Sequence, residues 1–92
     1  MKTTNQKGLD GYVYFPRPED RQIINDEMTK FSLIKMEELR SIYQRYQSKG
    51  WFGSRPFALK MIALHFTFLK KMGQSPFKHE GNIIEFGPLD HI

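Results

Sequence analysis

Basic side chains without acidic neighbours dominate the middle of the chain, and they are suited to bind a negatively charged partner. The segment 39–79 contains no Asp or Glu, and its cations are Arg40, Arg45, Lys49, Arg55, Lys60, Lys70, Lys71 and Lys78. Clustered cations of one sign are typical of surfaces that contact nucleic acid or an acidic protein, but they also suit a solvated face. A nucleic-acid contact would be made to backbone phosphates, because the helix expected over 54–72 is short of side chains that read base edges. The candidate residues for that contact are Arg40, Lys60, Lys70 and Lys71.

The segment 50–55, Gly-Trp-Phe-Gly-Ser-Arg, is the most distinctive local sequence. Two glycines before a helix N-terminus could leave backbone N–H groups free to hold an anion, assisted by Arg55. Trp51 and Phe52 fit poorly where a phosphate must approach, so the interpretation that we favour is a corner turned by the glycines and plugged by the two rings. Any ring that is exposed would instead suit a protein-binding hot spot. The candidate partner-binding residues are Trp51, Phe52, Arg55, Arg45 and Lys49.

Patterns for catalysis and metal binding are missing from the sequence. The three histidines are separated by 14 and 12 residues without a cluster of ligands near them, and Glu37 and Glu38 diverge on a helix. No nucleotide-binding loop or nucleophile elbow occurs. We therefore predict a protein that is not an enzyme, with no catalytic residue, cofactor or metal. His65 is expected to be a buried histidine bonded to a backbone group or a Tyr hydroxyl, and His79 an exposed loop residue.

The composition indicates one small globular domain. The chain has 92 residues, of which 39% are apolar and 26% charged, and its formal net charge is +4. The absence of cysteine excludes disulfides and thiolate-metal sites. No apolar run approaches the roughly 20 residues of a membrane span, and the N-terminus lacks the apolar segment of a secretory signal. We expect a flexible segment 1–10, a single domain over 11–92, no membrane contact and a cytoplasmic location.

Helical periodicity predicts the elements that position these residues. Short strands are expected over 11–15 and 82–86, and helices over 18–30, 32–49 and 54–72, with Ser32 as an N-cap and Glu19 and Asp20 as dipole-matching and solubilising charges. The apolar residues of 54–72 cover more than half of that helix, so it should be central. Its expected polar strip consists of Lys60, Ala63, Thr67, Lys70 and Lys71.

These patterns together predict a mainly α fold: a three-helix domain with a central apolar third helix and two short terminal strands that can pair as a small ribbon. The function that we expect is a small non-enzymatic protein-interaction or regulatory module, with a protein partner or a second copy. The alternative is backbone-directed binding of DNA or RNA through the basic segment 39–79. Salt distinguishes the two, because binding dominated by phosphate contacts weakens steeply as salt rises.

Overall fold

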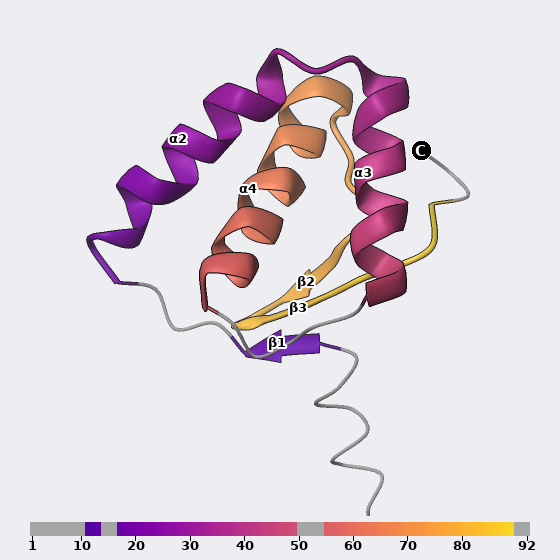
Figure 1. Ribbon diagram of the computed structural model, residues 1–92. Helices are drawn as coiled ribbons and strands as arrows, with labels where there is room; N and C mark the ends of the chain where they lie inside the picture. Colours follow the sequence, from indigo (N-terminus) through magenta and orange to yellow (C-terminus); the bar gives the residue numbers. More distant parts are fainter. Residues whose placement is uncertain (1–10, 14–16, 50–54, 90–92) are drawn as a thin grey trace, which may run out of the picture.

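Three helices and three short strands make up the described part of the chain, which in this computed structural model comprises residues 11–13, 17–49 and 55–89. In chain order the elements are β1 (Gly11–Val13), α2 (Asp20–Ser32), α3 (Met36–Lys49), α4 (Arg55–Met72), β2 (Lys78–Glu80) and β3 (Ile83–Glu85). Helix α4 lies between α2 and α3, and the strands lie beneath one end of the helices (Figure 1). The mainly helical fold with a central third helix is confirmed.

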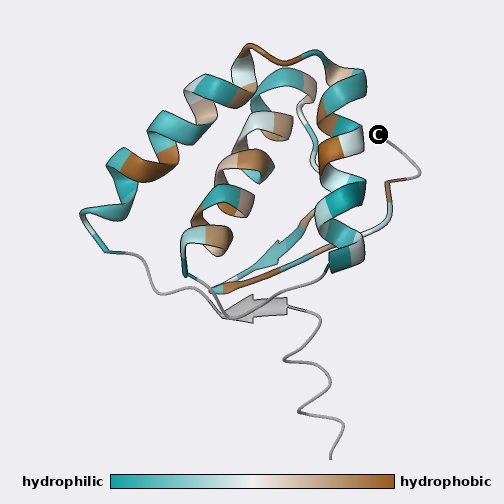
Figure 2. Ribbon diagram, in the orientation of Figure 1, coloured by the Kyte–Doolittle hydropathy of each residue, from teal (hydrophilic) through white to brown (hydrophobic). Residues whose placement is uncertain are grey.

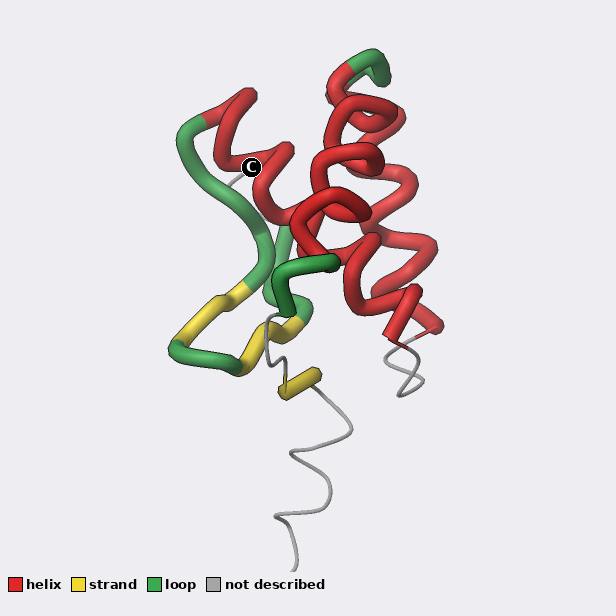
Figure 3. The backbone as a smooth tube through the Cα atoms, turned by 90° about the vertical axis from the view of Figure 1, so that its left-hand side faces the viewer, coloured by secondary structure: helices red, strands yellow, loops and turns green. Residues whose placement is uncertain are grey.

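The strands form one antiparallel sheet in the order β1-β3-β2. Gly11 pairs with Glu85 and Val13 with Ile83, so the expected ribbon between the two ends of the chain is confirmed. Strand β2 is a correction, because we expected a loop at His79. Glu80 pairs instead with Ile83 across a two-residue turn. In the perpendicular view this hairpin stands to one side of the helices (Figure 3).

The turn of the hairpin is formed by Gly81 and Asn82. Gly81 has a φ of 59°, the left-handed conformation that both common hairpin turns require at this position. Glycine adopts it without the steric cost that a Cβ brings. The hairpin therefore depends on a local turn signal rather than on the β-propensity of β2, whose three residues are all exposed.

The boundary between α2 and α3 differs from the prediction. Ser32 was expected to cap the second helix, but it is the last residue of α2, and its hydroxyl donates to the carbonyl of Thr29 at 2.7 Å. The N–H of Leu33 also bonds back, to the carbonyl of Lys30 at 3.2 Å. These bonds extend the helical turn, so α3 begins only at Met36.

Helix α4 is buried along most of its length, as its wide apolar arc predicts. Both other helices are hydrophilic over much of their surface and carry short hydrophobic stretches (Figure 2). The expected polar strip of α4 is wrong in part, because Ala63 and Thr67 are buried. Thr67 donates its hydroxyl to the Ala63 carbonyl at 2.8 Å, which satisfies the only polar group of its side chain. Solvent instead reaches Phe66 and Leu69, which are 37% and 38% exposed.

An aromatic cluster closes the fold between α3, α4 and the C-terminal segment. The Tyr43 ring packs edge-on against Phe68 and Phe77, with centroids 6.1 and 4.9 Å away. Its hydroxyl donates to the carbonyl of Gly87 at 2.5 Å. Burial raises the pKa of Tyr43 to about 12, against a smaller lowering by that hydrogen bond. A phenol held neutral at every physiological pH ties the chain after β3 to the middle of α3.

Candidate functional site

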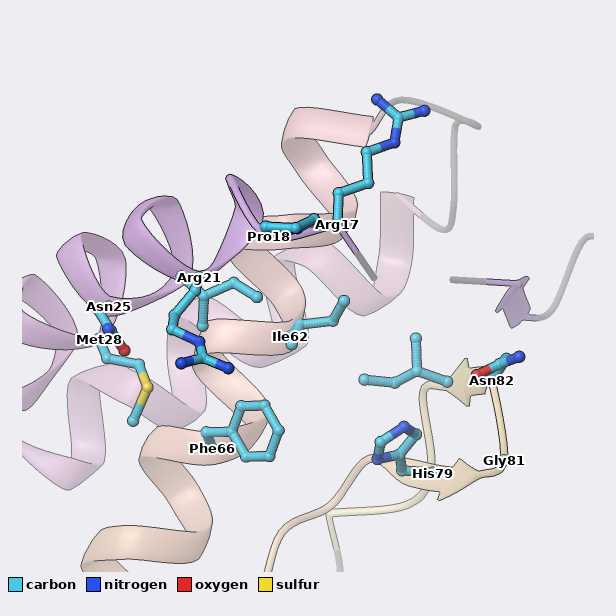
Figure 4. Close-up of a pocket in the computed structure, with 12 residues that line it drawn as sticks. Arg17, Pro18, Arg21, Asn25, Met28, Ile62, Phe66, His79, Gly81 and Asn82 are labelled. Carbon is cyan, nitrogen blue, oxygen red and sulfur yellow. The ribbon is translucent and has the colours of Figure 1, made fainter. Parts of the chain in front are cut away.

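A groove of about 800 Å³ opens between α2, α4 and the β2–β3 hairpin (Figure 4). Such a volume lies within the usual range of binding sites, roughly 300–1,000 Å³. Most of its lining is exposed, so it is a groove open to solvent rather than an enclosed cavity. The residues that line it are Arg17, Pro18, Arg21, Ile24, Asn25, Met28, Ile62, Phe66, His79, Gly81, Asn82 and Ile84.

The floor of the groove is apolar. Ile62 of α4 and Ile84 of β3 are buried at its base, with 5% and 1% of their surfaces exposed. Phe66 stands beside them with 37% of its surface exposed. Ile24 and Met28 continue the apolar surface along the wall formed by α2, and both are half-buried. An apolar side chain of a ligand would be removed from water here, because Phe66, Ile24 and Met28 are only partly covered by the domain itself.

Polar groups with unused hydrogen-bonding capacity surround this floor. The side chains of Arg21, Asn25, His79 and Asn82 line the groove and form no hydrogen bond or ion pair with the described residues. Arg21 extends along the groove beside Phe66, whereas the guanidinium of Arg17 points away from the other labelled side chains (Figure 4). None of the lining residues is acidic. The groove therefore combines an apolar floor with an unpaired guanidinium and lacks a carboxylate to neutralise it.

His79 connects the groove to a buried histidine. Its ring lies edge-on to that of His65, with centroids 5.2 Å apart. His65 is buried as expected, but its partner is a serine hydroxyl: Nδ1 lies 2.8 Å from Ser75 Oγ. Burial, together with a smaller contribution from the charge of His79, lowers the pKa of His65 to about 4. Near neutral pH His65 is therefore an uncharged part of the core rather than a cationic group of the site.

Arg55, one of the partner-binding candidates, belongs to an internal ion pair. Its guanidinium contacts the carboxylate of Asp20, whose side chain is only 4% exposed. The Arg17 N–H donates to the same carboxylate at 3.1 Å. The expectation of a solubilising charge at Asp20 is therefore wrong. The carboxylate fixes the start of α2 against the start of α4, because burying it requires charged and hydrogen-bonding partners.

Among the other partner-binding candidates, Arg45 and Lys49 are described and do not line the groove. Trp51 and Phe52 lie outside the described residues. Arg45 and Lys49 are exposed near the end of α3, and the Lys49 ammonium lies 5.9 Å from the centre of the Tyr46 ring. The structure thus separates these α3 cations from the opening formed by α2, α4 and the hairpin.

The candidate nucleic-acid residues are spread over two helices. Lys70 and Lys71 are exposed in the last turn of α4, whereas Lys60 borders a smaller hollow of about 340 Å³ that also includes Glu27. Ten residues of helix separate Lys60 from Lys70, about 15 Å along the axis. Arg40 is half-buried, and its Nε is enclosed without a hydrogen-bond partner in the described part of the chain. None of the four lines the larger groove.

Residues suited to metal binding do not gather in the described segments: no three His, Asp or Glu side chains there are placed to hold an ion. Among the described helices, none combines the length and the apolar character that crossing a membrane requires.

Comparisons with known proteins give no relative from which a function could be transferred. The chain matches no protein-family model, and searches of curated proteins and of solved structures return no significant match. The groove must therefore be interpreted from its own chemistry.

No single segment contains the groove residues, so no local sequence pattern identified them. Arg21 and His79 lie 58 positions apart and belong to a helix and a strand. One local signal was present: Gly81-Asn82 between two short segments is a typical hairpin turn, and it would have placed His79 on a strand facing the helices.

Proposed function

We propose that the protein is a non-enzymatic interaction module that holds a short segment of another protein in the groove between α2, α4 and the β2–β3 hairpin. The observation that carries this proposal is the apolar surface that Phe66, Ile24 and Met28 leave partly open beside exposed polar side chains. Exposed apolar surface rimmed by polar residues marks interaction sites in other proteins. Self-association through the same groove is the variant of this proposal in which a second copy supplies the segment.

The open shape of the groove favours a chain segment over a small molecule. Sites for small molecules bury roughly 70–90% of their ligand, which requires walls on most sides. Here Arg21, Asn25 and Asn82 are all exposed at the rim, and only the floor residues Ile62 and Ile84 are buried. A segment of polypeptide can place one side chain on the floor while its backbone stays near the rim.

Binding of DNA or RNA is less well supported by the positions of the cations. The four candidate residues lie on two helices, and two of them, Arg40 and Lys60, are half-buried. Phosphate-directed binding requires several cations that act on the same backbone. The groove offers a defined concave surface, whereas these cations offer no comparable feature.

The test is a peptide selection followed by NMR. Random peptides displayed on phage are selected on the immobilised protein, and the selected peptides are titrated into isotope-labelled protein. We expect shifts of the methyl groups of Ile24, Met28 and Ile62, because these line the groove. Mixed-sequence oligonucleotides are titrated in parallel at low and near-physiological salt.

Phe66→Ala and Leu69→Ala form a matched pair of variants for this experiment. Both residues are apolar, lie on α4 and are exposed to nearly the same extent, at 37% and 38%, but only Phe66 lines the groove. We expect Phe66→Ala to weaken peptide binding and Leu69→Ala to leave it unchanged. The proposal is wrong if no selected peptide depends on Phe66. Shifts with oligonucleotides at Lys60, Lys70 and Lys71 that fade with salt would then replace it with nucleic-acid binding.

A further inference from the structure

We infer that the groove recognises an acidic segment, in which an Asp or Glu carboxylate pairs with Arg21 while a neighbouring apolar side chain packs against Phe66. This inference rests on the proposed function, which it deepens by stating the chemistry of the partner. Two observations support it: the groove has an unpaired positive charge at Arg21, and the apolar side chains of the groove lie close to that charge.

The charge of the groove is unbalanced. Arg21 has no ion pair or side-chain hydrogen bond with any described residue, unlike the other charged side chains of α2: Lys30 pairs with Glu27 at 3.6 Å, Asp20 pairs with Arg55, and Asp26 accepts from the Gln22 amide at 2.8 Å. No acidic residue lines the groove. A guanidinium offers a planar fork of donors that matches a carboxylate with two parallel hydrogen bonds. The complementary charge is therefore expected to come from the bound segment.

Arg21 and the apolar floor lie close enough together for one short peptide to contact both. Arg21 extends beside Phe66 in the groove (Figure 4). From Arg21 to Met28 the wall of α2 runs for seven residues, about 10 Å. An extended peptide covers that length with about three residues. One acidic residue and one apolar residue next to it or two positions away can therefore contact Arg21 and the floor together.

The opposite wall can hold the backbone of such a segment. His79 and Asn82 face the groove from the hairpin, and neither uses its side chain in a hydrogen bond to a described residue. An amide both donates and accepts, and a neutral imidazole does so through its two nitrogens. These groups can form hydrogen bonds with the backbone N–H and C=O groups of a peptide of any sequence. Selectivity for the peptide sequence therefore comes from Arg21 and the apolar floor.

The test is a double-mutant cycle on the peptides selected above. Their sequences should be enriched in Asp or Glu close to an aromatic or aliphatic residue. Arg21→Ala should weaken binding by about tenfold or more, as expected for loss of a charged hydrogen-bonded pair. Replacing the acidic residue of the peptide by its amide should cost a similar factor with the wild-type protein and little more with Arg21→Ala.

Lys70→Ala is the matched control, because it removes one positive charge from an exposed site outside the groove. It should leave the affinity unchanged, which separates pairing with Arg21 from general attraction to a protein of charge +4. Equal losses in the two variants overturn the inference.

The outcomes distinguish the failure of this inference from the failure of the proposed function. Peptides that depend on Phe66 but lack acidic residues, or that bind Arg21→Ala unchanged, refute the acidic partner and leave the interaction groove intact. A selection that yields no Phe66-dependent peptide refutes both.

Discussion

Phe68 and Phe66 lie two residues apart on α4 but meet opposite surroundings. Phe68 is fully buried, and its ring meets that of Tyr43 edge-on at 88°. Phe66 is 37% exposed and lines the groove. Two residues of helix turn by about 200°, so the two rings occupy different flanks of one helix. We call the flank of Phe68 the closed flank, because its rings are packed and the Tyr43 hydroxyl is hydrogen-bonded. We call the flank of Phe66 the open flank, because its apolar surface is partly exposed and the polar side chains around it form no hydrogen bonds with the described residues.

The difference separates covered from uncovered apolar surface within a single helix. A small domain buries a limited share of its surface, so leaving apolar side chains open costs it stability that it could have gained. In this chain the closed flank contributes the rigid packing, and the open flank leaves apolar surface that the described residues do not cover. The experiments below measure whether the two flanks differ as the contacts indicate.

The largest effect is expected from removing the buried ring. Phe68→Ala should lower the free energy of unfolding by about 3–5 kcal/mol, because it leaves a cavity beside Tyr43 and loses the burial of a large apolar side chain. Phe66→Ala should cost clearly less than Phe68→Ala, since 37% of the Phe66 surface is already exposed. Urea denaturation followed by circular dichroism measures both. Similar losses in the two variants would contradict the division into a closed and an open flank.

The free energy of unfolding should fall at acid pH because of His65, whose ring lies against that of His79 in the groove. His65 has a pKa of about 4 in the folded chain, and an unfolded histidine has about 6.5. Between these values the unfolded state binds more protons, so the free energy of unfolding falls as the pH falls from about 6.5 to about 4. The loss amounts to about 3 kcal/mol at most, since each pKa unit corresponds to about 1.4 kcal/mol.

The control for this pH effect is His65→Asn, whose amide can still bond to Ser75 but does not titrate. Urea denaturation at a series of pH values should show a shallower fall for the variant than for the wild-type protein over this window. His79→Gln should raise the pKa of His65 modestly, because the charge on His79 is the smaller of its two causes. Parallel curves for wild type and His65→Asn would show that other groups govern the acid sensitivity.

The closed flank was largely predictable from the sequence, and the open flank was not. A wide apolar arc identified α4 as central, and nine residues of that helix are buried. Periodicity shows which side of a helix is apolar, but it does not show how much of that side a neighbour covers. Ile24, Met28 and Phe66 carry the same apolar signal as core residues, and only the positions of α2 and the hairpin leave them beside a groove.

Charged residues were predicted less well, for a related reason. Asp20 and Arg55 lie 35 positions apart, and neither local sequence indicates that the two meet at the starts of α2 and α4. Because Arg55 pairs with Asp20, this candidate binding residue has a structural role. Arg21 was not singled out, because it precedes the basic segment 39–79 and stands beside acidic residues in the sequence. Its significance comes from the groove, where none of the described lining residues is acidic.

The smallest effect concerns the polar group that the closed flank buries. Tyr43→Phe removes the hydroxyl that donates to the Gly87 carbonyl and should lower the free energy of unfolding by about 1 kcal/mol. The loss stays modest because the Gln47 amide also donates to that carbonyl, at 3.3 Å. Tyr46→Phe is the matched control, since the Tyr46 hydroxyl has no hydrogen-bond partner among the described residues.

Urea denaturation of the two tyrosine variants then asks whether the closed flank depends on polar specificity as well as on apolar burial. A loss confined to Tyr43→Phe would show that the hydroxyl holds the segment after β3 against α3. Equal and negligible losses would mean that the edge-on packing of the Tyr43 ring against Phe68 and Phe77 is sufficient. Apolar burial alone would then account for the stability of the closed flank. The two flanks would differ only in how much of their apolar surface neighbouring elements cover.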